Sequence, residues 1–387
     1  MKKTLLFAAV ICLAAAFTGC KDTKIPTNDT TKLWVAPNAD WTQVGYIDAK
    51  GNFAIPATYQ AAYDFCCGYA CVAVGNRVQF IDKNNKLQTS APAMDDCDVN
   101  FYHNCLGYKI SNLWGMVDTH FKTVIQPANY YLGYMSKDGL ALVQRTSSSK
   151  LGYMDRSGKV AIAEMYDGAS MFIDGVAVVR MGNYYGAIDK KGQFVINPTY
   201  DYLKSVGGGR IAFNEKGSDK GGLLDLKGNV VVAAMYDDFD PVGFTTSNLM
   251  VAERNNSFSF YDKNGNLAFP GNYISCSSFY DGVAWVLISE DSNWQLIDTK
   301  GKVLFSLDSN QEPYTIFHNG LAQIVTVGSN SATLEFIDKS KNVVYSCSVS
   351  ASDLAPARVK GQLDKTRLYA GTEAAMMVNP KEVNMDR

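Results

Sequence analysis

The chain has 387 residues, of which 47% are apolar and 19% are charged, so it has ample material for a hydrophobic core and is expected to fold. Its 36 basic and 38 acidic residues give a formal charge of −2. Proteins that bind nucleic acid or an anionic membrane surface rely on clustered Lys and Arg, so this balance argues against both roles.

The first twenty residues, "MKKTLLFAAVICLAAAFTGC", combine a basic start, an apolar run and small residues before Cys20. This layout is typical of a secretory signal and is too short for a comfortable membrane span. Its "FTGC" ending resembles the bacterial lipoprotein signal, although Phe17 replaces the usual leucine. The resemblance implies a signal peptide over residues 1–19 and a lipid anchor on Cys20. A soluble secreted protein cut near this point is the alternative.

Removal of Lys2 and Lys3 with the signal leaves 34 basic residues and a charge of −4. In Gram-negative lipoproteins an Asp after the cysteine favours the inner membrane, and Lys21 stands there in this chain. We therefore expect an outer-membrane lipoprotein with a periplasmic or surface-exposed body. Residues 20–30 are polar, which predicts a flexible tether. No other segment is expected to span a bilayer.

One motif, seen in "GYIDAKGNFAI" and "GAIDKKGQFVI", recurs along the rest of the chain. We number repeats 1 to 9 by its aspartates, which are Asp48, Asp82, Asp118, Asp155, Asp189, Asp225, Asp262, Asp298 and Asp338. Their spacing of 34 to 40 residues is typical of a solenoid, propeller or array. The motif predicts a repeat domain over residues 31–349, and residues 350–387 are left as a C-terminal cap or disordered tail.

The positions around each Asp predict a β-hairpin. Apolar residues precede the Asp, and Gly stands three residues after it in six repeats, with Asn85 in repeat 2, as a turn with positive φ requires. The Asp is expected to accept N–H groups two or three residues on. Repeats 3 and 9 have "DTHF" and "DKSK" without the glycine, so their turns are predicted to differ in shape.

A further strand, such as "GVAVV" at Gly175, precedes the Asp strand. In five repeats a Tyr stands eleven residues after the Asp and is expected to start a short fourth strand. Because these strands are apolar on both faces, each repeat needs neighbours that cover it. The sequence therefore predicts an all-β array of nine antiparallel β-meander repeats of about 36 residues. A propeller-like ring is favoured over an open β-solenoid, which stays open as the alternative.

The whole register resembles the bacterial WG-repeat proteins. The namesake pair survives at Trp114-Gly115, with Tyr185-Gly186, Leu151-Gly152 and Val44-Gly45 as variants, and Trp294-Gln295 keeps only the aromatic residue. The resemblance covers about residues 31–345. It implies extracytoplasmic or surface repeat proteins that bind partners, and it transfers no catalytic residue.

Residues that could carry chemistry are interpreted as structural. The nine aspartates offer nine equivalent turns rather than one special geometry, and "DKKG" lacks the second carboxylate of a calcium loop. His103 and His318 share one repeat position and are expected to face solvent. Cys66, Cys67, Cys71, Cys97 and Cys105 lack the spacing of a zinc site. Free thiols are their default state, and one disulfide among them is left open. We expect no enzyme activity, no cofactor and no metal.

The tips that join the "GVAVV" strands to the Asp strands vary most between repeats, so they are the candidate binding surface. Aromatic and Arg side chains are typical of binding hot spots. The candidate binding residues are Trp41, Arg77, Arg145, Arg180, Tyr184, Glu253 and Arg254.

We expect a non-enzymatic, envelope-anchored scaffold that binds a protein partner through these tips. A glycan-binding surface lipoprotein is the alternative, favoured by 22 Tyr and 5 Trp, and a hydrolase comes third.

Overall fold

The computed structural model describes residues 32–39, 42–75, 77–98, 100–145, 148–214, 217, 219–240, 242–328 and 331–350. The regular elements in these ranges are strands, and none of these residues belongs to a helix that could cross a bilayer. The chain divides into two compact units. Unit 1 holds residues 32–64 and 237–350, and unit 2 holds residues 65–236, within the described ranges. The predicted signal peptide, tether and most of the tail lie outside these residues.

Unit 2 contains repeats 2 to 6. Its strands in chain order are β5 (Tyr69–Val74), β6 (Arg77–Asp82), β7 (Asp96–Cys97), β8 (Cys105–Ile110), β9 (Leu113–Asp118), β10 (Thr123–Ala128), β11 (Tyr130–Met135), β12 (Leu140–Arg145), β13 (Leu151–Asp155), β14 (Val160–Tyr166), β15 (Gly168–Ala169), β16 (Val176–Met181), β17 (Tyr184–Asp189), β18 (Phe194–Tyr200), β19 (Leu203–Gly207), β20 (Arg210–Asn214), β21 (Gly221–Asp225) and β22 (Val230–Tyr236).

Unit 1 contains repeats 1, 7, 8 and 9. Its strands in chain order are β1 (Trp34–Pro37), β2 (Val44–Ile47), β3 (Phe53–Tyr59), β4 (Ala61–Ala62), β23 (Asp238–Phe239), β24 (Met250–Arg254), β25 (Ser257–Tyr261), β26 (Ser275–Cys276), β27 (Val283–Leu287), β28 (Gln295–Asp298), β29 (Val303–Ser306), β30 (Gln311–Pro313), β31 (Leu321–Val327), β32 (Ser331–Asp338) and β33 (Val343–Ser350).

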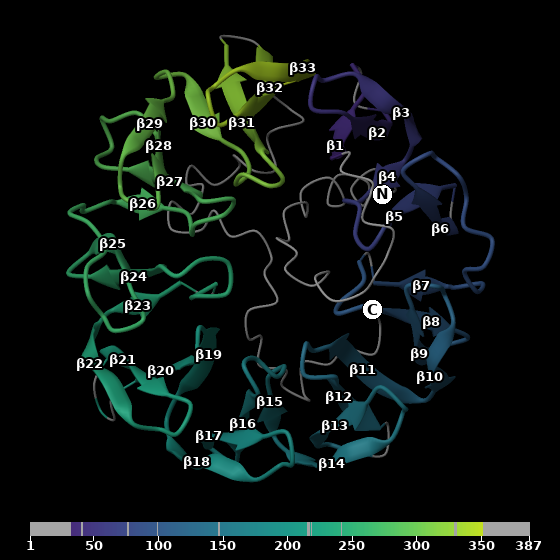
Figure 1. Cartoon of the computed structure of the whole chain (residues 1–387), viewed down its shortest axis with the longest axis vertical. Helices are drawn as coiled ribbons and strands as arrows, with labels where there is room; N and C mark the ends of the chain where they lie inside the picture. Colours follow the sequence, from purple (N-terminus) through teal and green to yellow (C-terminus); the bar gives the residue numbers. More distant parts are fainter. Residues whose placement is uncertain are drawn as a thin grey trace. The chain divides into compact units, whose positions relative to one another are not determined.

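Each repeat contributes one small antiparallel sheet, as Figure 1 shows for the order β15-β16-β17-β18 in repeat 5. In this sheet β15 is a short edge strand, β16 is the "GVAVV" strand, β17 is the Asp strand, and β18 is the other edge strand. One predicted detail is wrong. Tyr166 does not start a fourth strand of its own repeat, because it ends β14, and the short strand β15 after it belongs to the sheet of repeat 5.

The Asp turns are alike in all nine described copies. In each, one carboxylate oxygen accepts the N–H groups two and four residues on, as Asp189 does from Lys191 at 2.8 Å and Gln193 at 2.9 Å. The predicted N–H at position three instead donates to the backbone carbonyl of the Asp.

The prediction that the turns of repeats 3 and 9 differ in shape is wrong. Phe121 and Lys341 stand at the glycine position with φ of 58° and 65°, and both turns keep the same hydrogen bonds. Phe121 is only 6% exposed and packs on Tyr69, Phe80 and Phe101. This packing offsets the strain that a positive φ imposes on a bulky residue.

The glycine of the WG-like pair allows the last strand to cross closely over the Asp strand. A Cβ on Gly152 would lie 2.5 Å from the carbonyl oxygen of Ile162, and a Cβ on Gly186 would lie 2.7 Å from that of Ile196. At this point β14 carries extra residues, because Leu151 faces Tyr166 whereas Tyr153 faces Ile162. The glycine is therefore the position that accommodates a β-bulge.

Successive repeats cover each other's apolar faces, as the sequence predicts. One core cluster contains Leu151 and Tyr153 of repeat 4 together with Ala177 and Val179 of repeat 5. In repeats 4, 5, 6 and 8 the turn glycine also lies over a residue of the repeat before it, so that a Cβ on Gly192 would contact Ile162. We call such an interface between successive repeats a seam.

Within unit 1, repeat 1 packs on repeat 9 through a seam of the same kind. Trp34 and Ile47 share a core cluster with Leu334 and Phe336, and Gly51 sits over the backbone of Val344. Figure 1 shows β33 beside the sheet of β1, β2 and β3. In an open solenoid the first and last repeats are free ends. The fold class is therefore all-β with the blade arrangement of a β-propeller, in agreement with the favoured prediction.

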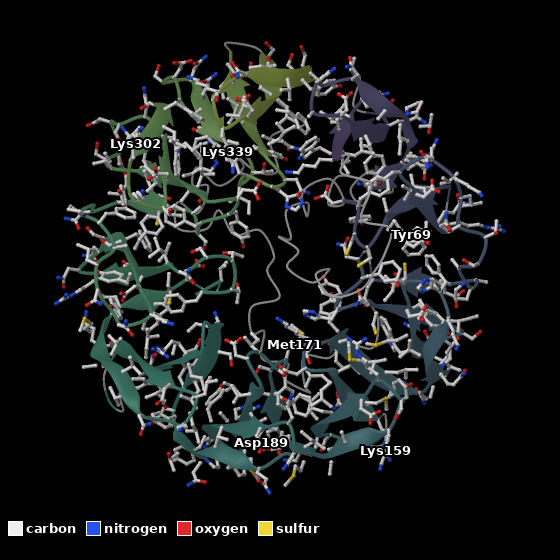
Figure 2. All side chains as sticks on the ribbon, in the orientation of Figure 1. Tyr69, Lys159, Met171, Asp189, Lys302 and Lys339 are labelled. Atoms are coloured by element: carbon white, nitrogen blue, oxygen red, sulfur yellow. The ribbon has the colours of Figure 1, made fainter. Side chains whose placement is uncertain are left out.

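A second link between repeats uses the Asp of an Asp-Gly pair that precedes three of the "GVAVV"-type strands, and the sequence interpretation missed it. Asp138 accepts the N–H of Gly175 at 3.1 Å, and Asp174 accepts that of Gly209 at 2.8 Å. In unit 1, Asp281 accepts the N–H of Gly320 at 2.6 Å, and Lys339, labelled in Figure 2, donates to the carbonyl of Asp281. The recurrence of Asp-Gly in the sequence was the available signal.

Candidate functional site

The hairpin tips of unit 2 place three of the predicted binding residues where they can reach solvent. Arg77 is exposed at the start of β6, between Val74 at 44% exposure and Val78 at 36%. Tyr184 is 44% exposed at the start of β17. Arg145 ends β12, and its side chain is 54% exposed. These tips therefore present cationic, aromatic and aliphatic groups.

Two of the predicted binding arginines, Arg145 and Arg180, already have partners in their own repeats. Nε of Arg145 lies 3.0 Å from a carboxylate oxygen of Glu164, and the backbone N–H of Arg145 donates to the same carboxylate at 2.7 Å. The guanidinium of Arg180 donates to the carbonyls of Gly182 and Asp167 at 2.8 and 2.9 Å. The side chain of Arg180 thus stabilises its own tip, whereas the side chain of Arg145 forms an ion pair and is still 54% exposed.

In unit 1, Arg254 is exposed at the end of β24 and Glu253 is half-buried beside it. Arg254 faces Ser257 across a two-residue tip whose residues, Asn255 and Asn256, both have positive φ. Two asparagines favour this turn because they tolerate the left-handed region. Trp41 and Cys20, the remaining predicted site residues, lie outside the described residues.

The carboxylates of the turn aspartates accept hydrogen bonds from backbone N–H groups. Hydrogen bonds from the N–H groups of Asn52 and Lys50 lower the pKa of Asp48, and those from Lys302 and Lys300 lower the pKa of Asp298. A general acid needs the opposite shift. Figure 2 labels Asp189, one of the nine turn aspartates. Among the residues that the structure describes, no three or more His, Cys, Asp or Glu side chains gather in a way that could hold a metal ion.

His318 of unit 1 does not simply face solvent, contrary to the sequence expectation. Its side chain is 19% exposed, and its Nε2 lies 3.6 Å from Oδ2 of Asp64 and 2.7 Å from Nδ2 of Asn319. The backbone carbonyl of His318 accepts the indole N–H of Trp34 at 2.9 Å. His318 thus joins repeat 9 to residues of the N-terminal part of unit 1, and no sequence signal pointed to this pairing.

A small cavity of about 40 Å³ lies beside this pair, lined by Asp64, Thr315, His318 and Gln323 among others. Burial raises the pKa of Asp64, and the charge of His318 opposes that shift. Pockets for organic ligands measure about 300–1,000 Å³, so this cavity has room for water-sized guests only. The pair is best understood as a polar link in the seam between repeats 9 and 1.

The cysteines are mostly buried. Cys71, Cys97, Cys105 and Cys276 are among the free thiols in the described part of the chain. Cys105 receives a hydrogen bond from Arg156 at 3.8 Å, and burial raises the pKa of its thiol. Cys66 donates to the carbonyl of Phe101 at 3.3 Å. These contacts join repeat 2 to repeat 3 and repeat 3 to repeat 4.

Several solved structures align with this chain. A crystal structure titled as the eukaryotic initiation factor aligns with a TM-score of 0.55 and 10% identity over 83% of this chain and 96% of that one. Apo AztD from Citrobacter koseri aligns with a TM-score of 0.39 and 14% identity over 83% and 96%. The dihydro-heme d1 dehydrogenase NirN aligns with a TM-score of 0.40 and 12% identity over 82% and 73%. At such identities the first alignment shows a shared fold and nothing of function.

By sequence, no curated protein matches the chain. The family model described as "WG containing repeat" matches five segments, which are residues 45–77, 114–145, 152–185, 185–218 and 258–290. Four of these begin at or next to the glycine that accommodates the bulge, and the fifth begins in β25 of repeat 7. Over these five segments the chain is similar to the WG-containing repeat family.

Proposed function

We propose that this protein is a non-enzymatic scaffold that binds a protein partner through its hairpin tips. The observation that carries the proposal is a contrast within each repeat. The Asp turn has the same hydrogen bonds in all nine repeats, and its carboxylate accepts backbone N–H groups. The tips differ in sequence between repeats and expose Arg77, Arg145 and Tyr184. Residues that the fold does not dictate are free to serve recognition.

The chemistry of the tip of β5 and β6 fits a protein partner. Val74 and Val78 flank Arg77, so one tip offers apolar contact together with a cation. Arg and aromatic side chains contribute most of the binding energy in many interfaces when neighbouring residues exclude water. A partner with an acidic rim around an apolar patch would fit this tip.

The test compares charge reversal on the two edges of unit 2. Arg77→Glu reverses a tip cation, and Lys159→Glu reverses an exposed cation beside an Asp turn, labelled in Figure 2, as the matched control. We expect a partner captured from source envelopes to bind the control like the wild type and the Arg77 variant at least tenfold more weakly, a loss of about 1.4 kcal/mol. Equal binding by both variants would remove this tip from the proposal.

We further propose that acyl chains on Cys20 hold the protein in the cell envelope, at the outer membrane. The support is the sequence before Cys20 and the Lys21 that follows it. Cys20→Ser is expected to move the protein from the membrane fraction to the soluble fraction, because it removes the acylated thiol. Retention of the variant in membranes would contradict lipidation. A glycan array run with the wild-type protein and Tyr184→Ala tests the alternative ligand class.

A further inference from the structure

Cys71 and Cys97 occupy a pair of positions that face each other across a seam. The strand partners define each position within its repeat. Cys71 in β5 pairs with Phe80, which stands two residues before Asp82. Cys97 in β7 pairs with Tyr108, and Tyr108 pairs on its other side with Gly115, three residues before Asp118. In repeat 5 the first of these positions is Val178, and in repeat 6 the second is Leu203. The two positions can therefore be identified in other seams by the same strand partners.

In the seams between repeats 4 and 5, repeats 5 and 6, and repeats 7 and 8, the two positions hold side chains of one hydrophobic core cluster. Val178 and Leu203 belong to one core cluster of repeats 5 and 6. Leu142 and Ala169 belong to one cluster of repeats 4 and 5, and in unit 1 Val251 and Cys276 belong to one cluster of repeats 7 and 8. The geometry of the repeat thus brings the two positions together, and the seam between repeats 2 and 3 fills them with two thiols.

The side chains of the two cysteines interact. Cys97 and Cys71 are hydrogen-bonding partners, and this bond, together with burial, raises the pKa of the Cys97 thiol. Cys71 is 3% exposed and Cys97 is half-buried, and both are free thiols. The two sulfur atoms therefore belong to adjacent repeats and meet inside unit 2, where a covalent bond would join the two sheets.

We propose that Cys71 and Cys97 form a reversible disulfide that fastens repeat 2 to repeat 3. The co-reactant is a disulfide, either oxidised glutathione or the disulfide of a thiol oxidoreductase. The thiolate of one cysteine attacks that disulfide and releases the first thiol. The second cysteine then loses its proton, attacks the mixed disulfide and releases the second thiol. Two protein thiols are oxidised and one external disulfide is reduced to two thiols.

The bond would act on stability rather than on a ligand. Cys71 and Cys97 are 26 residues apart, so a disulfide closes a loop of moderate length and restricts the unfolded chain. Repeat arrays depend on the strength of each interface between neighbours. A cross-link at this seam therefore holds two repeats together even when the seam opens locally.

The test uses the full chain, treated with oxidised glutathione or with dithiothreitol before alkylation. Chymotrypsin cuts after Tyr69 and Phe101, which separates Cys71 from Cys66 and Cys67 and separates Cys97 from Cys105. We expect a peptide that links Cys71 to Cys97 in the oxidised sample, and a melting temperature roughly 5–10 °C above that of the reduced sample.

The matched control is the double variant Cys71→Val with Cys97→Ala, which restores side chains of the kind found in the other seams. We expect it to fold and to melt at the same temperature with and without oxidised glutathione. Full alkylation of Cys71 and Cys97 in the oxidised, folded wild type would overturn the proposal, and so would a redox-dependent melting shift that persists in the double variant.

Discussion

Repeats 4 and 8 carry the same Asp turn, but they have different residues at the strand position three before the Asp. Repeat 4 has Gly152 three residues before its Asp, and two extra residues of β14 cross over it. Repeat 8 has Gln295 at that place, and its last strand keeps register there, with Gln295 facing Ser306 and Leu296 facing Phe305. The register shift of this strand pair lies nearer the turn, between Leu296 and Ile297. The glycine is therefore required by the bulge and not by the sheet.

The largest effect is expected where the glycine is replaced. In Gly152→Ala the new Cβ would lie 2.5 Å from the carbonyl oxygen of Ile162, so the backbone of β14 must move. We expect a loss of about 3 kcal/mol in the free energy of unfolding, the upper end for overpacking, measured by denaturant unfolding. Gln295→Ala in repeat 8 is the control, with a change below about 1 kcal/mol. Similar losses at both positions would remove the role assigned to the bulge.

The turn position that is glycine in most repeats offers a second contrast, because it holds Phe121 in repeat 3 and Lys341 in repeat 9. Truncating a buried Phe costs roughly 3–5 kcal/mol, and relief of its positive φ returns roughly 1–2 kcal/mol, so Phe121→Gly should destabilise by about 2 kcal/mol. Lys341→Gly relieves the same strain and gives up hydrogen bonds to Ser306 and Asp308 at the surface. We expect it to be neutral or stabilising by up to about 1 kcal/mol in thermal unfolding.

The shared Asp turn should respond less strongly. Asp189→Ala removes the acceptor of two backbone N–H groups near the surface, and we expect a loss of about 1 kcal/mol. Asp189→Asn keeps an oxygen acceptor and should lose less than half of that. The same pair of substitutions at Asp298 should give matching values, since the turn of repeat 8 has the same hydrogen bonds. Unequal values would show that the turns are not energetically equivalent.

The smallest effects are expected from pH, and they have opposite signs at two kinds of Asp. Hydrogen-bonded Asp48 and Asp298 have a pKa below 3.8, so their contribution is present above that pH and is lost as the pH falls through the lower folded value. Burial raises the pKa of Asp98 to about 7, so stability falls as the pH rises from about 4 to about 7.

The substitution Asp98→Ser separates these two contributions. Asp98 accepts the N–H of Gly107 at 2.9 Å, and in repeats 5 and 8 the hydroxyls of Ser170 and Ser277 accept the corresponding N–H. We expect the variant to melt at a higher temperature than the wild type at pH 8, with a smaller difference at pH 4. A wild type whose melting temperature rises steadily from pH 4 to pH 8, in parallel with the variant, would contradict the raised pKa.

Local chemistry made much of this fold predictable from sequence. The nine aspartates, the apolar residues before them and the turn glycines define hairpins, because a positive φ and a short acceptor side chain recur at fixed offsets. The exposed tip positions of Arg77 and Tyr184 follow from the same register. These features depend on residues a few positions apart, which a sequence displays directly.

Only the tertiary structure decided what depends on contacts between repeats. The packing of Phe121 on Phe80, the pairing of His318 with Asp64 and the meeting of Cys71 with Cys97 join residues that are distant in the chain. The sequence by itself determined the repeat, the Asp turn and the need for neighbours, because backbone sterics and apolar patterning act locally. The tertiary structure decided which repeat covers which and that repeat 1 packs on repeat 9, because the free energy of burial depends on where distant segments meet.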